Sequence, residues 1–143
     1  MPTSPERMAA ATWLRRLPFV ILAGASVWAA LRAPAGRKPF SFDCDLSLGA
    51  INDGLANPRH MWASGVLLVA AVIATGLRRI PLAIGMTVLV GSAWEAAQTT
   101  VVGHYARLRD LLPDLVGALA AAVIVRLLGW AWLTWSRSRS SSH

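Results

Sequence analysis

Four apolar runs, separated by shorter polar segments, dominate the 143-residue chain. Helices that cross the hydrocarbon core of a bilayer need about 20 mostly apolar residues, which three of these runs approach or exceed. The pattern therefore predicts an all-α fold, a four-helix transmembrane bundle. The expected spans are about residues 17–31, 61–77, 80–102 and 111–132.

Polar segments at the two ends of the chain border the predicted membrane domain. Residues 1–16 are polar and mixed, and we expect them to form an N-terminal segment. Residues 17–135 make up the four-span domain, whose end carries three tryptophans, as the interfacial regions of membrane proteins do. Residues 136–143 alternate serine with arginine and are expected to be a disordered basic tail.

The first run, at about 15 residues, is short for a span, but Trp13 and Trp28 suit the two interfaces. The alternative is a secretory signal peptide, with Arg15 and Arg16 before its apolar region and Ala33–Ala35 as the cleavage site. An arginine directly precedes that site and three more apolar runs follow. Both facts favour a membrane span.

Residues 32–59 form the one long hydrophilic segment, and their glycines and prolines exclude a long helix. We expect a loop between the first two spans that folds back against the membrane surface. Its acidic residues, with Asn52–Gly54, partly resemble a Ca²⁺-binding loop, but the spacing is not that of an EF-hand. Cys44 is the single cysteine, which excludes an intramolecular disulfide.

Composition and charge support a membrane location. The chain is 55% hydrophobic and 15% charged, with a net charge of +7. Its basic residues lie between apolar runs, so they indicate topology and attraction to anionic lipid, and no nucleic-acid partner is expected. The N-terminus, the tight turn between spans two and three, and the tail carry cations almost without acids: Arg7, Arg15, Arg16, Arg78, Arg79, Arg137 and Arg139.

The other side has six cations accompanied by four acids, among them Asp43, Asp45 and Asp53. This asymmetry predicts an N-in, C-in topology with the 32–59 loop outside the cytoplasm. We therefore expect a multi-pass protein of the inner (plasma) membrane, with membrane lipid as a binding partner.

Glu95 is the one acid embedded in an apolar run. Glu95 and Gln98 are three residues apart and share a helix face. Burying such groups in lipid is costly and often marks a functional site, although hydrogen bonding between helices is the alternative. The predicted topology places Glu95 in the outer leaflet, where further polar residues converge with it: His60, His104, Arg107, Asp110 and Asp114. Asp114 also suits a helix cap, and Gly117 a helix contact.

Residues 57–125 resemble the VanZ-like family of small bacterial membrane proteins. The carrying motifs are Glu95-Ala-Ala-Gln98 and Asp110-Leu-Leu-Pro-Asp114-Leu-Val-Gly117. Asp114 stands where the family usually has asparagine. The resemblance implies a role in envelope physiology, since the family's named member is associated with low-level glycopeptide resistance.

Two further positions extend the resemblance to VanZ-like proteins. His104 stands where the family has an arginine, with Arg107 and Arg109 close by as substitutes. Asn57-Pro-Arg59-His60 is similar to the family's Asp-Lys-x-x-His entrance to an earlier span, with shortened spacing.

The first functional hypothesis is binding of a lipid headgroup or an envelope precursor by the outer polar cluster. The second is an enzyme acting on a lipid-linked substrate, with an acidic general base, His60 or His104 as acid or metal ligand, and Arg107 holding a phosphate. Metal binding by Glu95, His60 and Asp114 would favour it. The third is a structural or transport subunit, as a homo-oligomer or in a complex. No catalytic residue, cofactor or metal is assigned, because no catalytic motif occurs.

Overall fold

The computed structural model describes residues 5–140, and the side chains of residues 11–139. Four long helices account for most of the chain: α1 (Pro5–Leu31), α3 (Pro58–Thr75), α4 (Ile80–Gln98) and α5 (Leu111–Ser140). Each forms all or most of a segment long and apolar enough to cross a membrane. The prediction of four such helices is therefore confirmed.

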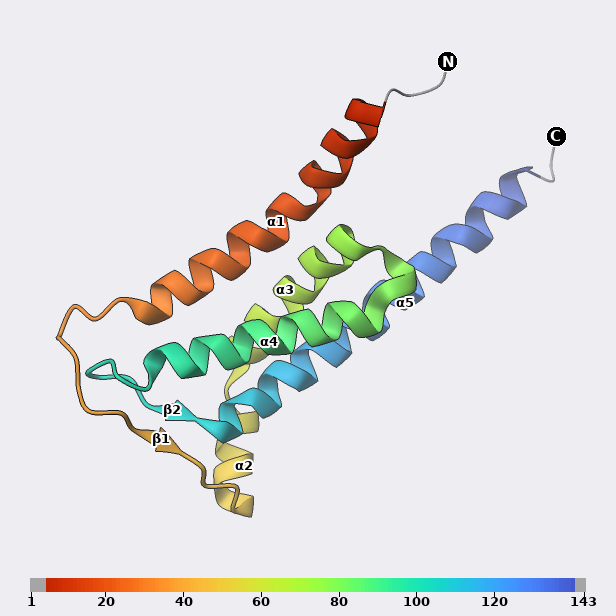
Figure 1. Ribbon diagram of the computed structural model, residues 1–143. Coiled ribbons are helices and arrows are strands. Elements are labelled where there is room, and N and C mark those ends of the chain that lie inside the picture. The colour runs from red at the N-terminus through yellow and green to blue at the C-terminus, as the bar shows by residue number, and fades with distance from the viewer. Residues whose placement is uncertain (1–4, 141–143) are drawn as a thin grey trace.

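The helices form a bundle with both chain ends, and the turn from α3 to α4, at the same end (Figure 1). α3 packs against each of the other three long helices. The short 3-10 helix η1 (Leu77–Arg79) makes the predicted tight turn between α3 and α4. Gly76 precedes it with φ of 89°, a left-handed backbone conformation that glycine adopts without strain.

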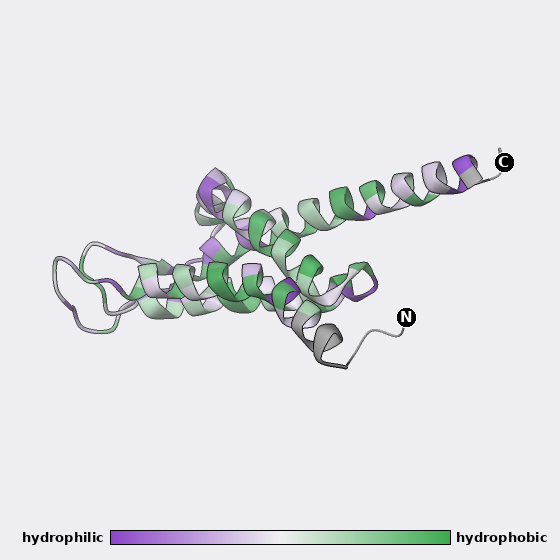
Figure 2. Ribbon diagram, turned by 90° about the horizontal axis from the view of Figure 1, so that it is seen from above, coloured by the Kyte–Doolittle hydropathy of each residue, from purple (hydrophilic) through white to green (hydrophobic). Residues whose placement is uncertain are grey.

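Small side chains hold the bundle together. Ala71, Ala83 and Ala118 are fully buried and surround Leu68 of α3. Large apolar side chains instead point outward: the exposed fraction is 58% for Val20 and 69% for Leu89. Helices in lipid gain little from burying apolar surface and pack closely through small residues, so this distribution suits a bilayer. Hydrophobic positions follow the long helices, and hydrophilic ones lie mainly in the connections and helix ends (Figure 2).

The predicted long loop contains structure of its own. β1 (Phe42–Asp43) pairs in parallel with β2 (Ala106–Arg107), and α2 (Leu48–Leu55) follows β1. Pairing with residues 99–107 continues through Lys38 N–H, which donates to the Thr100 carbonyl, and a bridge between Arg37 and Val101. The all-α prediction is therefore incomplete by one two-stranded sheet. Neither strand has the alternating run of residues that would reveal it from sequence.

Helix boundaries also differ from the sequence-based prediction: α3 runs from Pro58 to Thr75 and not from 61 to 77, and larger differences occur in α1, α4 and α5. α1 begins at Pro5, a residue type that suits the first helical position, and not at residue 17. Arg15 and Arg16 therefore lie within the helix, where Arg15 Nε donates to the Ile73 carbonyl and Arg16 lies over Trp13. α4 ends at Gln98, before a turn, and not at residue 102. α5 continues to Ser140, five residues into the predicted disordered tail, with serine hydroxyls donating to its own carbonyls. Residues 141–143 lie outside the described part.

Candidate functional site

Glu95 lies buried near the C-terminal end of α4. Its exposed fraction is 2%, and its Oε2 accepts a hydrogen bond of 2.8 Å from the backbone N–H of Arg107. The bond joins the end of α4 to β2. Among residues 11–139, no lysine or arginine forms an ion pair with Glu95. Its carboxyl group is thus held in the protein by a single neutral donor, an unusual arrangement for a buried acid.

His60 and Asp114 form a second polar contact, between the first turns of α3 and α5. Nδ1 of His60 lies 3.2 Å from Oδ1 of Asp114, which is 6% exposed. Asn57 caps α3 by accepting from the N–H of Arg59, which fixes the start of the helix just before His60. Gly91 of α4 leaves room for Asp114, since a Cβ there would be 2.5 Å from Oδ2.

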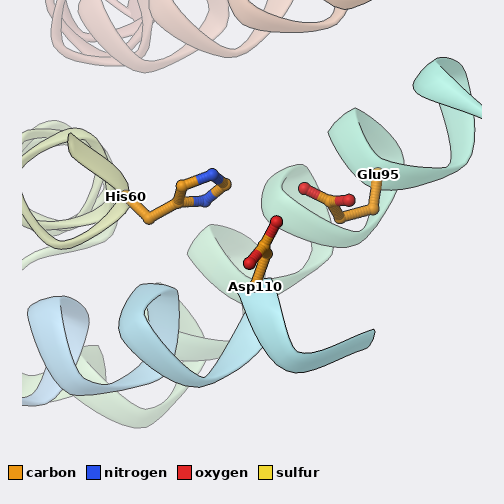
Figure 3. A group of neighbouring side chains, drawn as sticks. All are labelled: His60, Glu95 and Asp110. Atoms are coloured by element: carbon orange, nitrogen blue, oxygen red, sulfur yellow. The ribbon is translucent and has the colours of Figure 1, made fainter. Parts of the chain in front are cut away.

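Asp110 completes a group of three potential ligands. It ends the 3-10 helix η2 (Leu108–Asp110), directly before α5. One donor atom each from His60, Glu95 and Asp110 lies within 4.8 Å of the others. The three side chains come from different elements and point toward one another (Figure 3). An imidazole and two carboxylates are donors that divalent cations accept.

A cavity of about 430 Å³ opens beside this group. Its polar lining includes His60, Gln98 and Asp114, while Leu67 and Val90 belong to its apolar wall. All four long helices contribute. The remaining lining residues are Ser26, Asn57, Arg59, Ala63, Ser64, Thr87, Gly91 and Trp94.

Five of the predicted site residues come together at this end of the bundle: His60, Glu95, Gln98, Asp110 and Asp114. Gln98, 8% exposed, lies in the cavity wall one turn beyond Glu95. The carboxylate of Asp114 contacts the imidazole of His60. In the first turn of α5, this carboxylate also interacts favourably with the helix dipole.

The structure does not bring the side chains of two predicted residues, Arg107 and His104, into the group of His60, Glu95 and Asp110 or into the cavity lining. Arg107 gives its N–H to Glu95, while its guanidinium lies 5.6 Å from the centre of the Tyr105 ring. The backbone carbonyl of His104 accepts from Nζ of Lys38 at 2.5 Å. Within residues 11–139, the His104 side chain has no hydrogen bond or ion pair to the group. The Arg107 guanidinium is not part of the cavity lining, and its expected contact with a phosphate stays a prediction.

Arg109 and the acids of the 32–59 loop form a contact that the sequence analysis missed. Nη1 of Arg109 lies 3.3 Å from Asp43 and 3.9 Å from Asp45, and these ion pairs connect the loop to the segment before α5. Its Nε is buried without a hydrogen-bond partner in the described residues. The backbone N–H of Ser47 donates to Asp45 and lowers the pKa of that carboxyl.

The cavity lining also includes residues that the sequence analysis did not assign to the site. Arg59 could have been predicted, because it lies in the motif Asn57-Pro-Arg59-His60 that was compared with VanZ-like proteins. Ser26 of α1 could not, because its place in the cavity wall depends on how α1 crosses the other helices. No protein-family model, curated protein or solved structure matches the chain. The VanZ-like resemblance therefore stays a prediction from the residues themselves.

Proposed function

We propose that this protein binds the polar headgroup of a membrane amphiphile, a lipid or a lipid-linked envelope component, in the cavity between its four long helices. The observation that carries this proposal is the two-sided lining of the cavity. His60, Gln98 and Asp114 lie at one end, and Leu67 and Val90 continue between the helices. Ser64 and Thr87 also line this deeper part, but their hydroxyls donate to backbone carbonyls of their own helices. An amphiphile has the same division between headgroup and chain.

Volume and charge support the same ligand class. Sites for small molecules commonly enclose about 300–1,000 Å³, and this cavity of about 430 Å³ lies in that range. Arg59 offers a cation for a phosphate, Gln98 offers both a donor and an acceptor, and Asp114 offers an acceptor. A phosphate-bearing headgroup that also carries hydrogen-bond donors fits this set.

In this proposal the chain is N-in and C-in, in the plasma membrane of a bacterium. Support comes from the arginines at the end of the bundle where both termini lie, Arg78 and Arg79 among them. The cavity and the polar group then face the outer side, with the 32–59 loop. A VanZ-like role in envelope or antibiotic-resistance physiology follows as part of the proposal.

Native mass spectrometry of the protein in mild detergent tests the binding. The wild type is expected to retain a phosphate-bearing lipid. Two variants are expected to lose it: Ala63→Phe, which fills the cavity, and the double variant Glu95→Gln with Asp114→Asn. Ala120→Phe, on an exposed face of α5, is the matched control and should retain it. Equal retention in all forms, or no lipid in the wild type, would reject the proposal.

One observation favours the second hypothesis, an enzyme acting on a lipid-linked substrate. The group of His60, Glu95 and Asp110 adjoins the cavity through His60, and it contains residues able to act as acid, base or metal ligand. Incubation of the purified protein with the lipid it retains, followed by analysis of the released headgroup, tests this hypothesis. An unchanged lipid after prolonged incubation, with and without Zn²⁺, would reject it.

A further inference from the structure

We propose that His60, Glu95 and Asp110 bind one divalent cation. Their donor atoms lie within 4.8 Å of one another. Zn²⁺ binds such nitrogen and oxygen donors at about 2.0–2.2 Å, so small side-chain rotations are enough to close the three residues on an ion. The donors come from α3, α4 and η2, and their convergence is a property of the fold rather than of one local motif (Figure 3).

The charges of the group call for a cation. Glu95 is 2% exposed and has one backbone hydrogen bond, and Asp110 lies next to it. Among residues 11–139, no lysine or arginine pairs with either acid. A buried carboxylate and a half-buried one beside it repel each other unless a proton or a cation neutralises them. A divalent ion neutralises both at once.

Asp114 supplies the support that metal-binding histidines usually have. Its Oδ1 lies 3.2 Å from Nδ1 of His60. Histidine ligands commonly donate one ring N–H to a carboxylate, which fixes the tautomer and strengthens the other nitrogen as a ligand. A proton on Nδ1 leaves the lone pair of Nε2 for the ion. Asp114 therefore acts as a positioning residue for His60.

The donor set selects the kind of ion. An imidazole suits Zn²⁺ and other transition metals, while two carboxylates also suit Mn²⁺. Three protein ligands leave at least one coordination position open, as in catalytic zinc sites. Because His60 also lines the cavity, an ion there would attract an anionic headgroup. That last consequence rests on the proposed function, whereas cation binding does not.

Titration calorimetry with Zn²⁺ alone tests the site, on metal-stripped protein whose affinity tag has been removed. One ion per chain is expected. His60→Gln, Glu95→Gln and Asp110→Asn should each weaken binding at least tenfold. His104→Gln and Asp53→Asn are matched controls, because His104 lies outside the group and Asp53 is exposed in α2. Controls that lose binding as the ligand variants do, or ligand variants that keep it, would overturn the proposal.

X-ray absorption of Zn²⁺ bound to the wild type keeps the proposal testable even where a variant does not fold. One imidazole in a shell of nitrogen and oxygen is expected. Several imidazoles, or sulfur from Cys44, would overturn the assignment, as would the absence of stoichiometric binding by the wild type. A protein that retains lipid without binding Zn²⁺ contradicts only the cation site. A protein that binds Zn²⁺ but no lipid contradicts only the proposed function.

Discussion

Gly117 of α5 lies so close to the Met61 carbonyl of α3 that a Cβ at residue 117 would overlap that oxygen. Met61 directly follows His60 in α3, and Gly117 lies about one turn after Asp114 in α5. This close backbone contact between α3 and α5 therefore sets the distance between the side chains of His60 and Asp114. This finding agrees with the prediction that Gly117 is a helix-contact residue.

Gly117→Ala is accordingly expected to destabilise the protein by about 1–3 kcal/mol, because the added methyl group forces the helices apart. Gly24→Ala is the matched control: it lies in α1 with no atom within 4 Å of an added Cβ. Alanine there should be neutral or stabilise by about 0.5–1 kcal/mol. Reversible unfolding in mixed micelles measures both. Equal effects would contradict the close contact.

Gly91 and Asp114 should be energetically coupled. Gly91→Ala places a methyl group against Oδ2 of Asp114 and should cost about 1–3 kcal/mol in the wild type. In an Asp114→Ala background the carboxylate is gone, so the same change should cost far less. A double-mutant cycle measures this difference, and we expect a coupling of about 1 kcal/mol or more. Additive effects would show that Asp114 does not occupy the space beside Gly91.

Glu95→Gln should preserve expression and membrane insertion. The glutamine carbonyl still accepts the N–H of Arg107, and the side-chain volume is unchanged. The variant loses the negative charge, so Zn²⁺ binding should fall while the thermal unfolding midpoint stays within a few degrees of the wild type. Size-exclusion chromatography and thermal unfolding in detergent check the fold. Normal Zn²⁺ binding by a folded Glu95→Gln protein would show that the Glu95 carboxylate serves only as a hydrogen-bond acceptor between α4 and β2.

Cys44 provides a direct test of orientation, because it is exposed in the 32–59 loop. The N-in, C-in proposal predicts that a membrane-impermeant thiol reagent labels Cys44 in intact cells. A cysteine at Thr134, near the other end of the bundle, in a Cys44→Ser background should react only after lysis. Labelling of the Thr134→Cys variant but not of Cys44 in intact cells would establish the inverted topology.

Acid should loosen the start of α2. The bond from Ser47 N–H lowers the pKa of Asp45, so the folded chain favours the ionised acid. An acid of this kind contributes stability above its unfolded pKa of about 3.9, and that contribution is lost as the pH falls through the lower folded value. Hydrogen exchange at Ser47, corrected for intrinsic rates, should accelerate only below about pH 4. In Asp45→Asn this acid-dependent acceleration should disappear.

Sequence reasoning located the four helices because lipid imposes a strong and simple pattern: long apolar runs bounded by Arg78 and Arg79, or by Trp130 and Trp135. The short elements carry no such pattern. β1 and β2 have two residues each, and their pairing depends on how a distant loop reaches residues 99–107. A contact of this kind between remote segments is invisible to local periodicity.

The candidate site was predictable where residues sit at helix ends on the same side of the bundle. From the sequence alone, this reasoning predicts that His60, Glu95 and Asp114 lie close together. It could not tell how His104 and Arg107 are oriented, because the backbone of a turn decides whether a loop residue offers its side chain or its peptide group. Glu95 binds the peptide N–H of Arg107, a partner that residue type does not reveal.

α5 has a length that the bilayer does not need. Its 30 residues extend for about 45 Å, whereas the hydrocarbon core is about 30 Å thick. Asp114 lies in its first turn, and Trp132, Trp135 and Arg139 belong to its last turns. In a thicker or thinner membrane, the lipid boundary can shift along these last turns while the packed first turns keep their place. Adaptation to membrane thickness is thus separated, along one helix, from the geometry of the polar group.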